Sequence, residues 1–361
     1  MAKKNGFVLT GSVQEKNGKL YLVYPHYDPI KQVARPKWKS MGLYEGEKKA
    51  VIEKKKRELL RELEAEETRL REGYDNPENY PLLEFLTDWL LRCCELVDRY
   101  HPKLIYFDWW IQHSAVKPYL KRFAAYYFNR MEEYGGCVIN YKHDAMPFGI
   151  GVPDIERGQF AEAKPFLWQS DTSVMRGSWC YSKIPERASY KEPREVIWDL
   201  VDVVCKNGRL LLNFGPKPDG TLSDKDVEIL KAIGAWMKQN DEAIHGTGLW
   251  RYSQEGPTEM QEGQFADSKS RDFTSEDIRF TCKGDAVYAV ALVCPEDGVL
   301  RIKSMRKADA SSLPLFDGAV TNVQILGCDK PVQWQRDTEA LTVHFGDYRS
   351  DMPVVVKITV D

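Results

Sequence analysis

Helical patterns alternate with short apolar runs from about Pro81 to His245, and this alternation constrains the fold more than any other feature. The runs KLIYFD (103–108), CVINYK (137–142) and RLLLNFG (209–215) are continuously apolar over most of their length. Such strands, separated by helices, are typical of a parallel sheet with both faces covered. The sequence therefore predicts an α/β fold, with functional side chains at the carboxyl ends of the strands.

The helices of this region are predicted from apolar residues that recur at helical spacing. Ser223 is the predicted N-cap of the last helix. The predicted helices cover residues 82–100, 117–135, 192–208 and 223–239. Together with the strands they assign residues 82–245 to one α/β domain.

After about His245 the helical patterns stop and short strands follow. The runs DIRFTC, AVYAVALV, VLRIKS, TNVQILG, ALTVHF and VVVKITV are separated by turns. Many short strands at regular spacing are typical of a sandwich of two sheets. We therefore expect residues 246–361 to form a β-sandwich.

The first 75 residues have a different pattern. The pair Asn17-Gly18 between apolar runs predicts a β-hairpin, and residues 47–72 interleave charges at helical spacing. A small three-stranded sheet plus a helix is expected over residues 1–75, with a linker at 73–81. Residues 1–57 hold fourteen Lys and Arg against five Asp and Glu, about +9, so the rest carries about -12. This charge suits either an anionic polymer as partner or a solvated basic surface.

The composition gives no sign of a membrane segment or a metal site. No stretch approaches the roughly 20 apolar residues of a membrane span, and no signal-like run opens the chain. The eight cysteines form no CxxC pair and no zinc-like spacing with histidine. We expect a cytoplasmic protein with buried free thiols, no membrane partner and no metal.

Asp108 is the first candidate for catalysis. It ends the strand KLIYFD and precedes two tryptophans. This position suits a functional carboxylate, although an Asp that caps the next helix would give the same pattern. Glycosidases generally need a second carboxyl group across the glycosidic bond. Asp154, Glu156 and Glu162 are candidates, and spacing does not choose between them.

Six sequence blocks follow one another in the order and spacing of a known family. They are YFDWWIQ (106–112), VINYKHDAMPFG (138–149), PDIERG (153–158), LWQSDTSV (167–174), GSWCYS (177–182) and RLLLNFGPKPDGTL (209–222). The segment they define, about residues 82–361, resembles the retaining α-L-fucosidase family of glycoside hydrolases. The resemblance implies a (β/α)₈-like barrel with a C-terminal β-sandwich. It also implies hydrolysis of α-L-fucosyl linkages in glycans by double displacement, without metal or organic cofactor.

The resemblance also implies roles for individual residues. Asp108 corresponds to the nucleophile, because the family nucleophile ends the YFD strand. Glu156, in the block PDIERG, is the expected acid/base, with Glu162 as the alternative. The expected substrate is a fucosylated oligosaccharide or glycoconjugate.

Three further residues are expected to contact the sugar by the same resemblance. They are Tyr106, Lys142 and Trp179. Tyr106 lies two residues before Asp108, and Lys142 falls where relatives carry a basic residue. Trp179 falls in a block that supplies an aromatic wall. For each of them, core packing or surface display is the alternative.

The region ahead of Asp108 departs from the family. Only about 25 family-like residues precede it, and the chain has no adjacent His-His pair. Residues 5–75 instead resemble the arm-type DNA-binding domain of phage-type tyrosine integrases, whose catalytic residues have no counterpart here. The expectation is thus a partial barrel, with DNA as a second partner through residues 1–75. A homo-oligomer or a separate chain could pair the open sheet edges, and a catalytically defective fusion protein is the alternative function.

Overall fold

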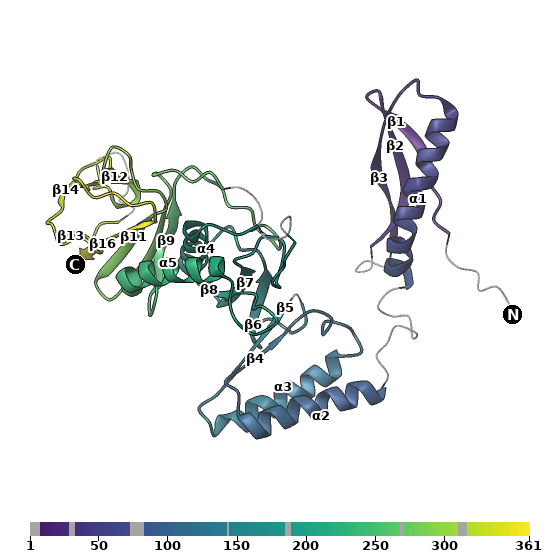
Figure 1. The fold of residues 1–361 in the computed structure, drawn as a ribbon, viewed down its shortest axis with the longest axis horizontal. Coiled ribbons are helices and arrows are strands. Elements are labelled where there is room, and N and C mark those ends of the chain that lie inside the picture. Colours follow the sequence, from purple (N-terminus) through teal and green to yellow (C-terminus); the bar gives the residue numbers. More distant parts are fainter. Residues whose placement is uncertain are drawn as a thin grey trace. The chain divides into compact units, whose positions relative to one another are not determined.

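The computed structural model describes residues 8–28, 33–72, 83–142, 144–184, 189–267, 271–309 and 316–361. The chain forms two compact units (Figure 1). The first unit contains the elements from β1 to α2 together with α3, and the second contains β4 and every element from β5 onward. The linker predicted at 73–81 lies outside the described residues.

The N-terminal part of the first unit is a three-stranded antiparallel sheet with one helix. Its elements are β1 (Ser12–Lys16), β2 (Lys19–Asp28), β3 (Val33–Tyr44) and α1 (Lys49–Glu72). Asn17 and Gly18 turn the hairpin with φ values of 56° and 74°, as an Asn-Gly pair favours. Leu20 and Leu22 of β2 pack with Leu59 and Leu63 of α1. The predicted sheet and helix are confirmed.

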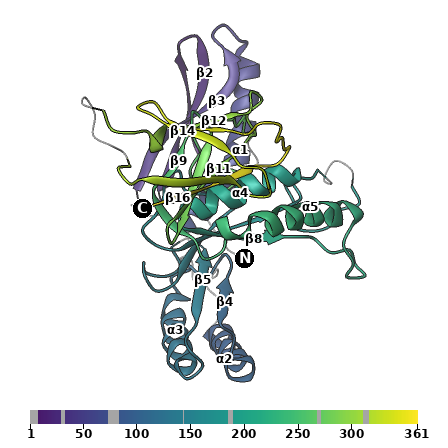
Figure 2. The ribbon, with the colours of Figure 1, turned by 90° about the vertical axis from the view of Figure 1, so that its left-hand side faces the viewer.

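Two further helices of the first unit pack on each other. They are α2 (Leu83–Tyr100) and α3 (Lys117–Glu132), which lie side by side in Figures 1 and 2. The rings of Trp89 and Phe123 meet with centroids 6.3 Å apart. The hydroxyl of Tyr126 lies 2.7 Å from both carboxylate oxygens of Asp98. Both predicted helices are confirmed.

The second unit begins with a curled five-stranded parallel sheet, which forms half of a barrel. Its strands, in spatial order, are β4 (Leu104–Phe107), β5 (Val138–Lys142), β6 (Val152–Glu156), β7 (Trp168–Ser173) and β8 (Gly208–Asn213). On its outer face Trp168 and Ile155 pack with Val203 of α4 (Pro193–Cys205). The predicted partial barrel is confirmed. Strands β6 and β7 had no counterpart among the strands expected from apolar runs.

The C-terminal residues form the expected β-sandwich. One sheet has the order β13-β16-β11-β10-β9 and the other the order β12-β15-β14. Side chains such as Phe280 and Leu341 fill the space between the sheets. The strands are β9 (Gly248–Glu255), β10 (Ile278–Lys283), β11 (Ala286–Ala291), β12 (Val299–Ile302), β13 (Val320–Ile325), β14 (Gln333–Arg336), β15 (Leu341–His344) and β16 (Val354–Val360).

The half-barrel and the sandwich share a core within the second unit. Helix α5 (Asp224–Asn240) and helix α4 cover the outer face of the five-stranded antiparallel sheet (Figure 1). Trp198 and Trp236 of these helices pack with Tyr288 of that sheet. Ser223 caps α5 as predicted, because its Oγ accepts a hydrogen bond from the backbone N–H of Asp226.

The cysteines follow the prediction only in part. All eight are free thiols, but only Cys205 is buried, and Cys180 is exposed. The expectation of buried thiols is wrong for the others, because an apolar sequence neighbourhood does not say which face of a helix or strand a residue occupies. No helix in the described ranges is long and apolar enough to cross a membrane.

Candidate active site

A cavity of about 490 Å³ opens at the carboxyl edge of the parallel sheet. Lys142, Glu156 and Asn213 are the last residues of β5, β6 and β8, and Asp108 directly follows β4. This is the edge where parallel α/β folds gather functional side chains. The cavity is lined by Asp108, Lys142, Glu156, Asp171, Trp179, Leu211, Leu212, Asn213 and Phe214.

Asp108 presents an exposed carboxylate to this cavity. Its Oδ1 accepts a hydrogen bond of 2.8 Å from the backbone N–H of Trp109. The next helix, α3, begins at Lys117 and has Val116 as its N-cap. Asp108 is therefore not the cap of that helix, and the alternative left open by the sequence is excluded.

Glu156 lines the same cavity and is 9% exposed. The indole Nε1–H of Trp109 donates to its Oε2, and Lys142 Nζ lies 3.3 Å from that oxygen. Glu162 is exposed in the connection between β6 and β7 and lines a different cavity beside Trp250. Of the two acids, Glu156 is the one that shares a cavity with Asp108.

Lys142 is buried among carboxylates. Its Nζ donates hydrogen bonds of 2.8 Å to Oδ1 of Asp154 and 2.8 Å to Oδ1 of Asp171. Burial alone would lower the pKa of this lysine, but its hydrogen bonds to the two aspartates outweigh burial and raise the pKa. The ammonium is thus charged at neutral pH, and the surface-display alternative does not hold.

Asp154 lies behind the cavity rather than in its wall. Its Oδ2 accepts a hydrogen bond of 2.6 Å from Gln169, and the residue is 2% exposed. Burial, followed by the charge of Asp171, raises its pKa to about 7. Burial thus favours the protonated form of Asp154 beside Lys142.

Tyr106 and Trp179 occupy different positions. Tyr106 is not among the residues that line the cavity, and its hydroxyl lies 3.4 Å from carboxylate oxygens of both Asp154 and Asp171. Trp179 does line the cavity, and its carbonyl accepts a hydrogen bond of 2.8 Å from Asn213. Of these two expected sugar contacts, Trp179 therefore lies in the cavity wall, whereas Tyr106 belongs to the network behind the wall.

Asp171 and Asn213 were not singled out as site residues from the sequence. Asp171 lies in β7, whose six residues WQSDTS are all buried. The available signal was the block LWQSDTSV, which carries an acid at its centre. Because that block lacks an apolar run, no strand was predicted there, and so no site residue was sought at its end.

Metal coordination finds no support in the described ranges, which hold no cluster of three or more His, Cys, Asp or Glu side chains suited to an ion. The carboxyl groups of Asp154, Glu156 and Asp171 instead surround the ammonium of Lys142. That ammonium supplies the positive charge at their centre.

Comparisons with known proteins identify related sequences. The family model described as "Alpha-L-fucosidase" matches residues 4–242, and "Alpha-L-fucosidase C-terminal domain" matches residues 270–359. Tissue alpha-L-fucosidase of Rattus norvegicus is 27% identical over 248 residues, which are 67% of this chain and 47% of that protein. The Homo sapiens enzyme is 32% identical over 172 residues, 48% of this chain and 31% of that protein. The chain spans about half the length of the curated relatives it matches.

Solved structures show the same fold. One, described as "alpha-L-fucosidase", superposes with a TM-score of 0.59 at 23% identity and covers 77% of this chain and 57% of its own. The Thermotoga maritima alpha-fucosidase in complex with fucose gives a TM-score of 0.58 at 21% identity, with coverage of 77% and 57%. At these identities the superpositions establish the fold.

The sequence matches extend the family assignment. We expected the resemblance to begin near residue 82, whereas the family match begins at residue 4 and includes the segment likened to integrases. The two matches together leave unmatched only the two ends of the chain and the connection between residues 242 and 270. The chain belongs to the α-L-fucosidase family.

Proposed function

We propose that this chain hydrolyses α-L-fucosyl linkages by a retaining double displacement, with Asp108 as nucleophile and Glu156 as acid/base. The observation that carries the proposal is that both carboxyl groups line one cavity in a member of this family. A retaining mechanism needs two such groups on one bound sugar. The proposed substrates are fucosylated oligosaccharides or glycoconjugates.

In the first step the Asp108 carboxylate attacks the anomeric carbon. The bond from that carbon to the leaving oxygen breaks, and Glu156 gives its proton to that oxygen. In the second step the Glu156 carboxylate takes a proton from water, whose oxygen attacks the anomeric carbon and releases Asp108. Two inversions leave the released fucose with the configuration of the substrate.

The charges around the cavity support this chemistry. Among the described residues, three carboxyl groups line it, from Asp108, Glu156 and Asp171, and the lining ammonium is that of Lys142. With Glu156 protonated for the first step, two carboxylates still outnumber one ammonium. The excess of negative charge favours a transition state with positive charge on the sugar ring. We assign sugar contact to Lys142 and Trp179, and assign Tyr106 to the support of Asp154 and Asp171.

The test is hydrolysis of 4-nitrophenyl α-L-fucoside by the full chain. Asp108→Asn should abolish release of 4-nitrophenol. Glu156→Gln should keep much more activity on this substrate than on a fucosylated oligosaccharide, because 4-nitrophenolate departs without a proton. Glu162→Gln is the matched control and should resemble the wild type on both substrates.

The product configuration gives a second readout. Proton NMR during the first minutes should show the α-anomer of fucose before mutarotation. If the wild type releases no more 4-nitrophenol than Asp108→Asn, the hydrolase proposal is rejected and a catalytically defective protein becomes the better description.

We also propose that a second copy of the chain pairs with the open edges of the parallel sheet. Within the described strands, nothing pairs with the outer edge of β4 or of β8. Leu104 of β4 is 49% exposed. Open edges with apolar side chains favour strand pairing between chains. Light scattering coupled to size exclusion should give a dimer mass, and a monomer at micromolar concentration would exclude the proposal.

The second candidate function is DNA binding by residues 1–75. Trp38 of β3 is 46% exposed, and Lys16 Nζ lies 5.9 Å from the centroid of its ring. Lys37 and Lys39 flank this tryptophan and are exposed. A basic surface with an exposed ring suits phosphate contact together with base stacking.

Fluorescence anisotropy with labelled duplex and single-stranded DNA at two salt concentrations tests this candidate. Binding should weaken steeply with salt, and a Lys37→Glu, Lys39→Glu double variant should bind less. Absence of binding at low salt ends this candidate and leaves the hydrolase proposal untouched.

A further inference from the structure

Arg157 directly follows Glu156 and has an unusual backbone conformation. Its φ is +46°, in the left-handed region that residues with a side chain rarely adopt. The residue is 7% exposed, so a charged guanidinium is buried next to Glu156 in the sequence. Such a conformation persists only where the surrounding contacts hold it.

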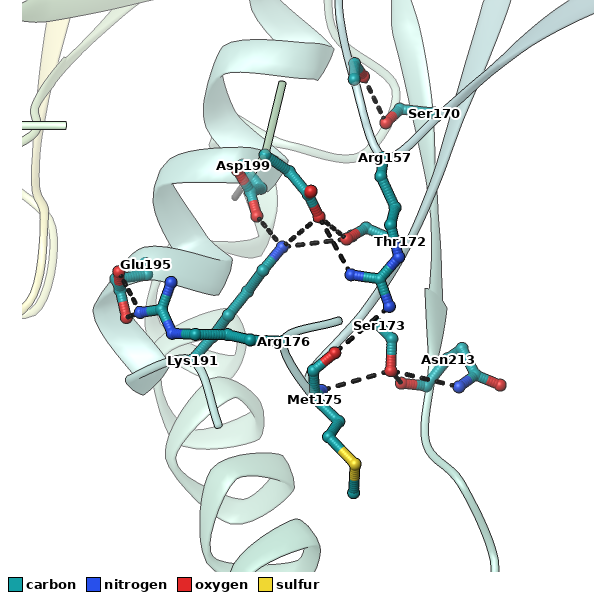
Figure 3. A network of polar contacts seen from close by, with 12 residues as sticks. Arg157, Ser170, Thr172, Ser173, Met175, Arg176, Lys191, Glu195, Asp199 and Asn213 are labelled. Atoms are coloured by element: carbon teal, nitrogen blue, oxygen red, sulfur yellow. Dashed lines mark hydrogen bonds and ion pairs between the residues drawn. The ribbon is translucent and has the colours of Figure 1, made fainter. Parts of the chain in front are cut away.

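The guanidinium of Arg157 holds the segment that carries Trp179. Nη2 donates hydrogen bonds of 2.7 Å to the carbonyl of Ser178 and 3.2 Å to that of Met175, and Figure 3 shows the second of these. Its central carbon lies 4.4 Å from the centroid of the Trp179 ring. Arg157 thus fixes both the backbone that leads to Trp179 and the face of its indole.

A buried ionic network holds Arg157 in turn. Asp267 Oδ2 lies 3.5 Å from Arg157 Nη1 and accepts hydrogen bonds from Thr172 at 2.6 Å and from Lys191 at 2.9 Å. Lys191 Nζ also lies 2.9 Å from Oδ2 of Asp199 (Figure 3). Burial alone would raise the pKa of Asp199, but Arg271 and Lys191 outweigh burial and lower the pKa. Asp199 therefore stays charged and keeps Lys191 in place.

Asp267 lies in the connection between β9 and β10 of the sandwich. This connection runs along the residues that follow β6. Phe265 N–H donates to the carbonyl of Glu156 at 2.9 Å, and Asp267 N–H donates to that of Arg157 at 2.9 Å. Gln159 and Gly263 exchange backbone hydrogen bonds. The sandwich thus contacts the chain at the residue proposed as acid/base.

We propose that Arg157 is a positioning residue that sets Trp179 as the wall of the cavity, and that Asp267 of the sandwich connection fixes Arg157. The cavity is taken to bind a fucosyl group, and in this respect the inference rests on the proposed function. Lysine cannot replace Arg157, because a single ammonium lacks the planar fork that bonds two carbonyls and stacks on a ring.

Hydrogen–deuterium exchange with mass spectrometry on the full chain tests the inference without any activity. Arg157→Lys should exchange several-fold faster in peptides from residues 175–182, while peptides from β10 and β11 should be unchanged. The isosteric variant Asp267→Asn should also speed exchange in the peptides from residues 175–182. It provides the test if Arg157→Lys does not fold. Arg301→Lys, at an exposed pair with Asp297 in the sandwich, is the matched control. Unchanged exchange of residues 175–182 in the folded variants overturns the inference.

Kinetics separates positioning from chemistry. Arg157→Lys should raise KM for 4-nitrophenyl α-L-fucoside about tenfold and change kcat and its pH profile little. The reason is that Trp179 contacts the sugar equally in the substrate complex and in the transition state. A fall in kcat at constant KM would overturn the positioning role. A wild type that is inactive would reject the proposed function, and the exchange experiment would still decide the role of Arg157.

Discussion

The indole Nε1–H of Trp109 donates a hydrogen bond to Oε2 of Glu156. Trp109 directly follows Asp108, and its backbone N–H donates to Oδ1 of that aspartate. One residue therefore holds both carboxyl groups of the proposed mechanism. The spacing between nucleophile and acid/base depends on the conformation of Trp109.

Trp109→Phe removes the donor to Glu156 and keeps an aromatic ring. We expect kcat for a fucosylated oligosaccharide to fall at least tenfold. Glu156 becomes charged as it gives up its proton, and a hydrogen bond to a charged group contributes about 1.5–3 kcal/mol. Initial-rate kinetics measures the effect. Trp110→Phe is the control, since Trp110 is 69% exposed, and it should retain wild-type kcat. Equal kcat values for the two variants would contradict the role of the indole.

Lys142→Met tests the centre of the carboxylate network. The variant leaves Asp154 and Asp171 buried without their shared cation, and truncating one partner of a buried pair costs about 3–5 kcal/mol. Urea unfolding followed by circular dichroism should show a midpoint far below that of the wild type.

The control for that experiment is Lys303→Met. Lys303 Nζ lies 3.1 Å from Oε2 of Glu276, and the two side chains are 69% and 66% exposed. Exposed pairs contribute little to stability, so this variant should unfold close to the wild type. A small effect of Lys142→Met would mean that Asp154 and Asp171 are stable without the lysine.

The sequence predicted the strands whose residues are mainly apolar and missed those in which polar residues interrupt the apolar run. Strands β4, β5 and β8 contain continuous apolar residues and were recognised. Strands β6 (VPDIE) and β7 (WQSDTS) present polar side chains to the network around Lys142, and this interrupts the apolar pattern. Asp171 was missed for the same physical reason, since a buried acid there depends on a partner from another strand.

The role of the sandwich could not be predicted either. Asp267 and Arg157 are 110 residues apart in the sequence and meet only in the folded unit. The turn residues and composition of 256–277 carry no sign of that contact. In contrast, the position of Asp108 followed from local pattern alone, because a strand end is set by the strand itself.

Asp154→Asn should remove a pH dependence of stability. The folded protein holds a proton on Asp154 up to a pKa of about 7, whereas the unfolded chain loses it near the ordinary value of 3.8. Its contribution to the free energy of unfolding is therefore largest at low pH and falls as the pH rises from about 4 to about 7. Urea unfolding at several pH values should show the wild type losing stability relative to Asp154→Asn over this range. A constant difference between the two would contradict the raised pKa.

Gly158→Ala tests the contact between the sandwich connection and the chain after Glu156. A Cβ at Gly158 would lie 1.9 Å from the carbonyl oxygen of Gly263. The backbone hydrogen bonds between Gln159 and Gly263 must therefore break or shift. We expect a loss of at least about 1–3 kcal/mol in the free energy of unfolding, as for overpacked sites. Gly234→Ala, in α5 with nothing within 4 Å of its added Cβ, should instead gain about 0.5–1 kcal/mol. Because both variants add one methyl group, opposite signs in thermal unfolding would assign the loss to the contact at Gly263, and equal signs would contradict that contact.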